Sequence, residues 1–152
     1  MSGETNKASM ERSFDLLIVD DDVSQASMLR TLLRDIGLTH RCHHCCSGEE
    51  ALQYLHRESP FENACRPHLI LLDLNMPGID GCEVLKRIKS DPHTQSIPVV
   101  MLSSSGSVEN IVNCYMEHAN AYIRKPADLA GNLAMLRHLD HFWKGCELTP
   151  GK

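Results

Sequence analysis

The sequence predicts an α/β protein, a doubly wound sheet of five parallel strands with five helices packed on its two faces. Short apolar runs of strand length alternate along the chain with segments in which apolar residues recur at helical spacing. Turn or polar residues bound these runs. Parallel strands need crossover connections, which are right-handed and usually contain a helix. The alternation therefore indicates one parallel sheet covered on both sides.

Composition is typical of a single soluble globular domain: 152 residues, 42% hydrophobic and 23% charged. The net charge is -5, whereas a nucleic-acid binder usually carries an excess of basic residues, so we expect no direct DNA contact. The polar start, "MSGETNKASMERS", is neither a signal peptide nor a membrane span, which predicts a cytoplasmic protein with no membrane contact. We expect a flexible tail over 1–13, a folded domain over 14–143 and a short tail over 144–152.

The strands are predicted from short apolar runs. Three runs indicate buried strands, at residues 14–19, 68–73 and 97–103, and two weaker candidates lie at 39–46 and 121–124.

In the segments between the predicted strands, apolar residues recur at helical spacing. The stripe of Leu29, Leu32, Leu33 and Ile36 ends at Gly37, a residue that commonly terminates helices. Ser47 and Glu50 have the spacing of a capping box and begin a second helix. Three more helices are predicted around Val84 to Ile88, over 107–116, and around Leu129 to Leu139.

Sheets of this class bind ligands outside the carboxyl ends of their strands, and in the flavodoxin-like order 2-1-3-4-5 the switch point lies between strands one and three. Strong polar residues follow four of the predicted strands: Asp20, Asp21 and Asp22 after the first, Asp73 after the third, Ser103 at the end of the fourth and Lys125 after the fifth. The sequence therefore predicts a polar site at this edge of the sheet.

The acidic residues indicate a metal ion. Two carboxylates about 4 Å apart repel by about 4 kcal/mol at an effective dielectric of 20, so a cluster of them favours a bound cation. An all-oxygen ligand set suits a hard cation, and Mg²⁺ is commonly held by one or two carboxylates with water and phosphate oxygens. We therefore predict Mg²⁺.

With a metal present, Asp73 could act as a nucleophile that accepts a phosphoryl group as an aspartyl phosphate. The ammonium of Lys125 and the hydroxyl of Ser103 could then hold the phosphoryl oxygens. Taken singly, a rim aspartate is more often a helix cap, and a lysine a solvated charge. The coincidence of these signals at one edge favours a site.

The same motifs resemble the receiver domains of bacterial two-component response regulators, over about residues 14–143. The matching pieces are "VDDD", "LLDLNMPGIDG", "VVMLSSS" and "AYIRKP". The resemblance implies that Asp73 takes phosphate from a sensor histidine kinase or a phosphotransfer protein, with no enzymatic activity beyond its own phosphorylation and dephosphorylation. It also implies that Asp21, Asp73 and the main-chain carbonyl of Asn75 ligate Mg²⁺, and that Asp20 assists.

No second domain is predicted after the fifth helix, so we expect a stand-alone receiver. The resemblance implies that it signals to an unknown downstream protein through the face of its fourth and fifth strands and helices. The switch in such receivers couples the hydroxyl of Ser103 to the aromatic ring of Tyr122. The Lys125–Pro126 bond is expected to be cis, as in many receivers. The stretches "LRHLDHFW" and "EVLKRIKSDPHTQSIPVV" look most similar to small receivers that serve phytochrome-type kinases.

Two short stretches leave alternatives open. Cys42 and Cys45 have C-x-x-C spacing, but strand alternation separates them and no second pair completes a metal site, so "RCHHCC" favours an edge strand with free thiols. Phe142 and Trp143 predict either a homodimer contact or the last helical turn packing on the sheet.

Two other protein classes share parts of the pattern. A phosphatase of the haloacid dehalogenase class also uses an aspartate and Mg²⁺, but it needs a second carboxylate where this chain has Asn75. A flavodoxin-like flavin carrier needs a phosphate-binding loop where this chain has "DDDVSQ", whose carboxylates would repel a flavin phosphate.

Overall fold

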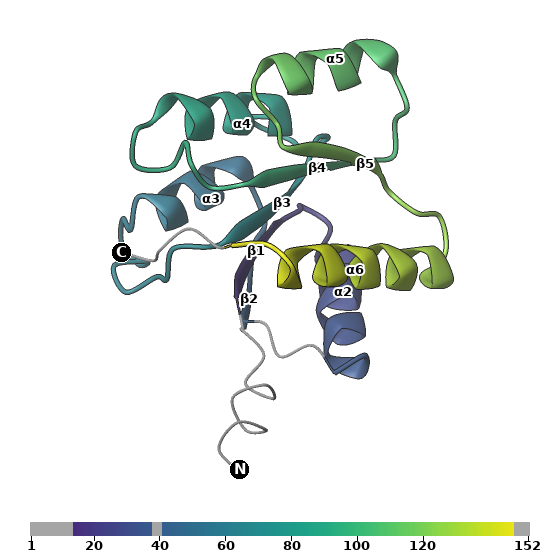
Figure 1. Ribbon diagram of the computed structural model, residues 1–152. Helices are drawn as coiled ribbons and strands as arrows, with labels where there is room; N and C mark the ends of the chain where they lie inside the picture. Colours follow the sequence, from purple (N-terminus) through teal and green to yellow (C-terminus); the bar gives the residue numbers. More distant parts are fainter. Residues whose placement is uncertain (1–13, 38–40, 148–152) are drawn as a thin grey trace.

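Five parallel strands form the centre of the molecule, in the order β2-β1-β3-β4-β5 (Figure 1). The structure is a computed structural model, and it describes residues 14–37 and 41–147. The strands are β1 (Asp15–Val19), β2 (Arg41–Cys45), β3 (Leu69–Asp73), β4 (Val99–Ser103) and β5 (Ala121–Arg124). The predicted strand order is confirmed.

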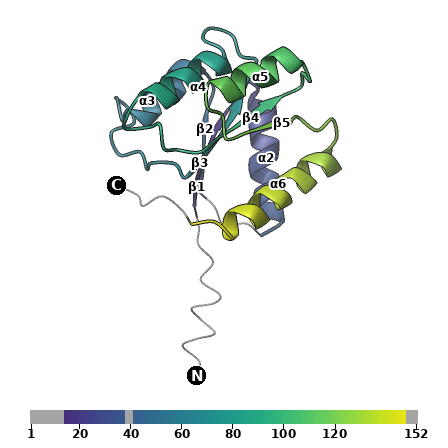
Figure 2. The ribbon, with the colours of Figure 1, turned by 45° about the horizontal axis from the view of Figure 1, so that its top comes forward.

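Helices cover both faces of this sheet. They are α2 (Val23–Asp35), α3 (Gly48–Leu55), α4 (Gly81–Ser90), α5 (Val108–Met116) and α6 (Leu129–Lys144). Helices α2 and α6 lie together on one face, whereas α3, α4 and α5 cover the other (Figures 1 and 2). The doubly wound α/β class predicted from the sequence is therefore confirmed.

Alternation along the strands divides the core into two apolar layers. Leu17 and Val19 of β1 face α3, α4 and α5, whereas Leu16 and Ile18 face α2 and α6. All residues of β3 and β4 are buried. A strand covered on both faces can use apolar residues at every position, which is why these runs read as continuous rather than alternating.

Each described helix begins at a side chain that accepts a hydrogen bond from a main-chain N–H of the first turn. These N-cap residues are Asp22, Ser47, Asp80, Ser107 and Asp128. Such caps stabilise a helix by about 1 kcal/mol each. Asp22 therefore serves α2, which leaves Asp20 and Asp21 as the acidic residues available for a site.

The capping box predicted at Ser47 is present with one change. Oγ of Ser47 accepts a hydrogen bond from the main-chain N–H of Glu50 at 3.1 Å. The carboxylate of Glu50 reaches back to the N–H of Cys46, at 2.8 Å, rather than to that of Ser47. The start of α3 is thereby fixed directly after β2.

Gly81 allows α4 to begin against the end of β3. A Cβ atom there would lie 2.2 Å from the carbonyl oxygen of Asp73 and 2.8 Å from Cα of Leu74. Because backbone atoms cannot move aside without shifting β3, Gly81→Ala should lower the free energy of unfolding by about 1–3 kcal/mol. Urea denaturation measures this, with Gly145→Ala as the control, since its Cβ would meet only an ordinary contact at 3.5 Å. An equal effect of the two substitutions would contradict this account of Gly81.

Some predicted boundaries were wrong. The strand predicted at 97–103 begins at Val99, because Pro98 has no N–H for the ladder. Helix α6 ends at Lys144, so its last turn includes Phe142 and Trp143 and it extends one residue into the tail predicted over 144–152. For the strand predicted at 39–46, residues 39 and 40 lie outside the described residues.

The expected cis bond before Pro126 was also wrong. Lys125–Pro126 is trans, and the cis bond in the described ranges is Ser59–Pro60. Trans is the more stable form of most X-Pro bonds, and the expectation depended on the resemblance alone.

Cys42 and Cys45 lie on the edge strand β2, with their side chains on opposite faces of the sheet. Cys42 packs against the α2 and α6 layer, whereas Cys45 is buried in the other layer. Burial raises the pKa of the Cys42 thiol to about 11 and that of Cys45 to about 12. The two thiols therefore cannot chelate one metal together, and the edge-strand prediction is confirmed.

For the aromatic pair at the end of α6, the structure supports packing of the last helical turn at Trp143. Trp143 packs against the α2 and α6 layer, whereas 63% of Phe142 is exposed.

In residues 14–37 and 41–147, no helix is both long and apolar enough to cross a bilayer.

Candidate metal and phosphoryl site

The carboxyl ends of β1, β3, β4 and β5 bring the predicted site residues to one edge of the sheet. Asp20 follows β1, Asp73 ends β3, Ser103 ends β4 and Lys125 follows β5. Asp20 and Asp73 are only 3% and 5% exposed, and Ser103 is fully buried. Buried polar side chains at the ends of central strands must be satisfied by one another or by a ligand.

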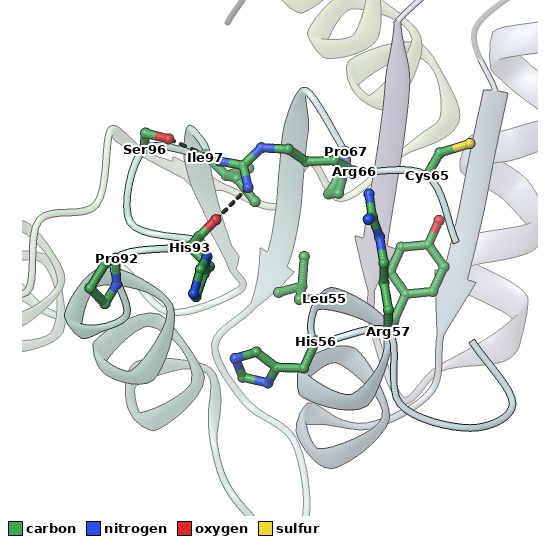
Figure 3. Close-up of a pocket in the computed structure, with 11 residues that line it drawn as sticks. Leu55, His56, Arg57, Cys65, Arg66, Pro67, Pro92, His93, Ser96 and Ile97 are labelled. Atoms are coloured by element: carbon green, nitrogen blue, oxygen red, sulfur yellow. Dashed lines mark hydrogen bonds between the residues drawn. The ribbon is translucent and has the colours of Figure 1, made fainter. Parts of the chain in front are cut away.

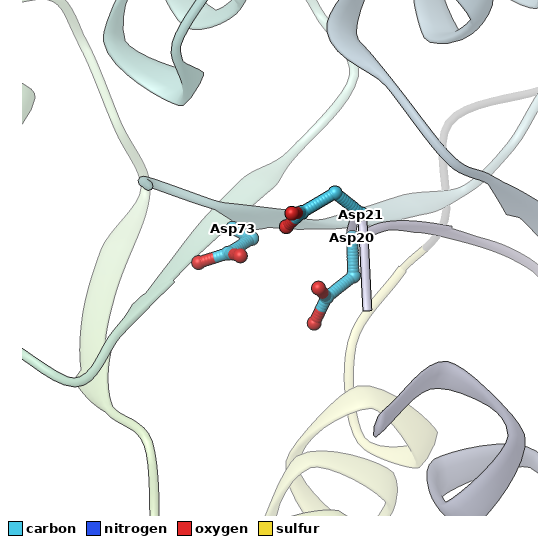
Figure 4. A group of neighbouring side chains, drawn as sticks. All are labelled: Asp20, Asp21 and Asp73. Atoms are coloured by element: carbon cyan, nitrogen blue, oxygen red, sulfur yellow. The ribbon is translucent and has the colours of Figure 1, made fainter. Parts of the chain in front are cut away.

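Three carboxylates form the acidic part of the site. Oxygen atoms of Asp20, Asp21 and Asp73 lie within 4.8 Å of one another (Figure 4). Asp21 is exposed, whereas the other two are buried, so the cluster opens to solvent on the Asp21 side. An all-oxygen set of this kind suits a hard divalent cation.

Lys125 supplies the positive charge opposite these carboxylates. Its Nζ lies 3.2 Å from Oδ2 of Asp20 and 3.3 Å from Oδ1 of Asp73. Burial alone would lower the pKa of Lys125, but the two carboxylates outweigh it and the pKa lies above its ordinary value. Lys125 therefore remains an ammonium that bridges the two buried acids.

Asp73 is held in an unfavourable environment for its charge. Burial raises the pKa of its carboxyl to about 6, although the ammonium of Lys125 lowers it, and the carboxylate of Asp20 adds to the rise. A single cation does not compensate three clustered carboxylates. The site therefore favours a second positive charge, which a divalent metal would provide.

This environment predicts a pH dependence of metal binding. Below about pH 6, protons compete with the cation for Asp73, so the affinity for a divalent metal should fall by up to about tenfold per pH unit. Titrations with Mn²⁺ across this range measure the effect. Asp73→Asn should weaken binding and flatten the profile, whereas an unchanged wild-type affinity across it would contradict the assignment of Asp73 as a ligand.

The loop after β3 contacts the end of β4 through Asn75. Its main-chain N–H lies 3.4 Å from Oδ1 of Asp73, and its side-chain Nδ2 lies 3.5 Å from Oγ of Ser103. Oγ of Ser103 also accepts a hydrogen bond from the N–H of Ser105, at 3.1 Å. Ser103 therefore lies at the junction of the two loops that border Asp73.

Tyr122 belongs to the same region but not to the acidic cluster. Its hydroxyl donates a hydrogen bond to the carbonyl oxygen of Ser105, at 3.0 Å. Its half-buried ring packs against the layer that includes α4 and α5. The tyrosine predicted as the switch residue thus contacts the loop that begins at Ser103.

One contact to the acidic loop was missed in the sequence. Nε2 of His44 lies 2.7 Å from the main-chain oxygen of Asp20. The sequence assigned His44 to an edge strand and to a doubtful cysteine motif. No spacing rule links it to Asp20, because the contact joins two strands paired in space.

A cavity of about 510 Å³ lies away from this site, between the C-terminal end of α3 and the turn that follows α4 (Figure 3). The guanidinium of Arg66 crosses it, donating hydrogen bonds to the carbonyl of His93 and, at 2.9 Å, to Oγ of Ser96. His56 pairs with Asp91 at 2.7 Å. These hydrogen bonds and this ion pair link the segment after α3 to the turn after α4, and none of the residues belongs to the acidic cluster.

Comparison with known proteins agrees with this geometry. Residues 16–137 match the response regulator receiver domain. The chain is 33% identical to the response regulator Rcp1 of Synechocystis sp. over 143 residues, which cover 94% of both chains. Neither the phosphatase nor the flavin-carrier alternative is supported by these matches.

Solved structures give the same result. The phosphorylated cyanobacterial phytochrome response regulator RcpA superposes with a TM-score of 0.85 at 36% identity, covering 91% of this chain and 100% of that one. The Mn²⁺-bound form of Rcp1 has a TM-score of 0.83 at 32% identity, covering 90% and 99%. That form and the acidic cluster described above fit divalent metal binding. The chain therefore belongs to the receiver domain family of two-component response regulators.

Proposed function

We propose that Asp73 accepts a phosphoryl group from the phosphohistidine of a sensor histidine kinase or a phosphotransfer protein, in a Mg²⁺-dependent reaction. One observation carries this assignment. Oδ1 of Asp73 is held by Lys125 and the N–H of Asn75, whereas Oδ2 accepts no hydrogen bond from the described residues. Asp20 has both oxygens engaged, by the N–H of Asp22 and by Lys125. Of the two buried carboxylates in the acidic cluster, Asp73 is therefore the one with an oxygen available to attack.

In the proposed reaction, an oxygen of Asp73 forms a bond to phosphorus as the bond from phosphorus to the histidine nitrogen breaks. Mg²⁺, held by Asp21, Asp73 and the carbonyl of Asn75, would neutralise charge on the phosphoryl oxygens. Lys125, already 3.3 Å from Asp73, pairs with another of these oxygens. Asp20 keeps Lys125 charged and in place.

The proposed output begins at Ser103. Its hydroxyl would leave the N–H of Ser105 to contact the phosphoryl group, and the loop beyond it would move. The hydroxyl of Tyr122 donates a hydrogen bond to the carbonyl of Ser105, so that movement would break this hydrogen bond and allow the ring of Tyr122 to turn inward. The surface of β4, β5, α5 and α6 would then differ between the two states for a downstream protein.

The proposed partner is a phytochrome-type kinase, because RcpA, which is 36% identical to this chain, is a phytochrome response regulator. We propose a receiver domain over 14–143 that acts in the cytoplasm without DNA contact and without catalytic turnover of small molecules. A homodimer through the exposed Phe142 remains part of the proposal.

Intact-mass spectrometry tests the assignment. Incubation with a small acyl phosphate and Mg²⁺ should add the mass of one phosphoryl group, and EDTA should prevent the addition. A phosphomonoester substrate should not be turned over. A protein that gains no phosphoryl group in Mg²⁺, or that hydrolyses the phosphomonoester repeatedly, would refute the proposal.

A further inference from the structure

The histidine pair in "RCHHCC" has no role in the reaction proposed above. We infer that His44 is a positioning residue for the metal site, acting through the main chain of Asp20. The inference depends on the proposed function, because it concerns the same metal.

The contact lies where the pairing of β1 and β2 ends. The N–H of Asp20 donates to the carbonyl of Cys45 at 3.1 Å, which is the last ladder hydrogen bond between the two strands. In a parallel ladder the carbonyl of Asp20 would next accept from residue 47. Ser47, however, is the N-cap of α3, where the chain has turned away from the sheet. His44 replaces the missing donor with its side chain, at 2.7 Å.

The direction of this hydrogen bond follows from its partners. A main-chain carbonyl only accepts, so Nε2 of His44 must carry the proton. The donor is fixed because it comes from β2, one strand away from Asp20. A carbonyl at the end of a central strand is thereby held by a rigid element rather than by solvent.

The carbonyl of Asp20 belongs to the same planar peptide unit as the N–H of Asp21. Asp20 itself is held at four points: its N–H, its carbonyl and both carboxylate oxygens. The exposed side chain of Asp21 makes no hydrogen bond or ion pair in the described part of the chain. Its direction toward the metal therefore depends on this peptide plane, and His44 is the side chain that fixes the plane.

His43 provides a matched control on the same strand. Its ring stacks on Tyr54 with centroids 4.3 Å apart, and it meets the edge of Phe61 at 5.8 Å. These contacts lie on the opposite face of β2 from His44. Replacement of His43 should affect packing without reaching the acidic cluster.

The test is the affinity for Mn²⁺ alone, measured by the electron paramagnetic resonance of the free ion at about pH 8, where Asp73 is ionised. Loss of a group that supports a metal ligand typically weakens binding 10–100-fold. We expect about tenfold weaker binding for His44→Leu, which keeps bulk but removes the donor. His44→Gln, whose amide can donate over a similar reach, should stay within about threefold of wild type. His43→Leu should leave the affinity unchanged.

Urea denaturation in EDTA, followed by the single tryptophan, shows whether each variant is folded. Wild-type affinity in a folded His44→Leu variant would overturn the inference. If His44→Leu does not fold, the decision passes to His44→Gln, whose loss of affinity despite the retained donor would also overturn it. Absence of Mn²⁺ binding in the wild-type protein would instead contradict the proposed function itself, so the two failures can be distinguished.

Discussion

Asp73→Asn should abolish phosphoryl uptake and, in the absence of metal, should make the folded protein more stable. An amide cannot act as the nucleophile, which explains the first effect. The second follows from electrostatics, because the carboxylate is buried beside Asp20 and its pKa lies at about 6. The substitution removes a charge that the fold tolerates at a cost.

The sign of the pH effect follows from proton binding. Between the ordinary pKa of 3.8 and about 6, the folded state binds more protons than the unfolded state, so stability falls as pH rises through this window. Above about pH 6 the full cost is present, at most about 3 kcal/mol for a shift of this size. The pKa of about 6 already includes the attraction between Asp73 and Lys125, so we expect a net gain of about 1–3 kcal/mol for Asp73→Asn.

Urea denaturation in EDTA, above and below this window, measures the gain, which should shrink at low pH. Asp22→Asn is the matched control, since it removes a charge from the same acidic run while asparagine caps α2 equally well. The control should still take up a phosphoryl group. Lower stability of Asp73→Asn at neutral pH would contradict the description of Asp73 as an unfavourably buried charge.

Lys125→Met should have the opposite effect on stability. Lys125 is 18% exposed at its side chain and is the cation that contacts both buried carboxylates. Removing one partner of a buried ion pair usually costs 3–5 kcal/mol, and partial exposure reduces the expected loss to about 2–4 kcal/mol. Phosphoryl uptake should also slow, because the ammonium no longer pairs with the phosphoryl oxygens.

The same denaturation in EDTA measures this loss, and added Mg²⁺ should recover part of it. Lys86→Met is the control, because Lys86 is exposed on α4 and contacts no site residue. The double variant with Asp73→Asn should regain stability, since fewer buried charges remain uncompensated. If Lys125→Met were as stable as the Lys86→Met control, the ion pairs of Lys125 with Asp20 and Asp73 would contribute nothing to the free energy of unfolding.

The fold could be predicted because each level of the sequence indicates the same structure. Apolar runs such as 68–73 are short, bounded and separated by amphipathic segments, which only a covered parallel sheet accommodates. Element ends were less predictable. Pro98 shortened one strand through its missing N–H, and Glu50 capped the N–H of Cys46 through a choice between nearby donors that spacing does not determine.

The residues of the site could be predicted as a set because the carboxyl ends of parallel strands meet at one edge. Their individual states could not. Loop geometry determines that one carboxylate oxygen of Asp73 accepts no hydrogen bond from the described residues, and that the hydroxyl of Tyr122 donates to the carbonyl of Ser105. The contact of His44 with Asp20 depends on where pairing between two strands stops, which is a property of the folded chain.

The most direct test of the central claim is to locate the phosphoryl group. After incubation with an acyl phosphate and Mg²⁺, borohydride reduces an aspartyl phosphate to homoserine, which marks the modified residue permanently. Peptide mass spectrometry should place this mark on residue 73 and leave Asp20 and Asp21 unmodified. A mark on either of those two aspartates, or a protein that keeps all three after full phosphorylation, would contradict the account.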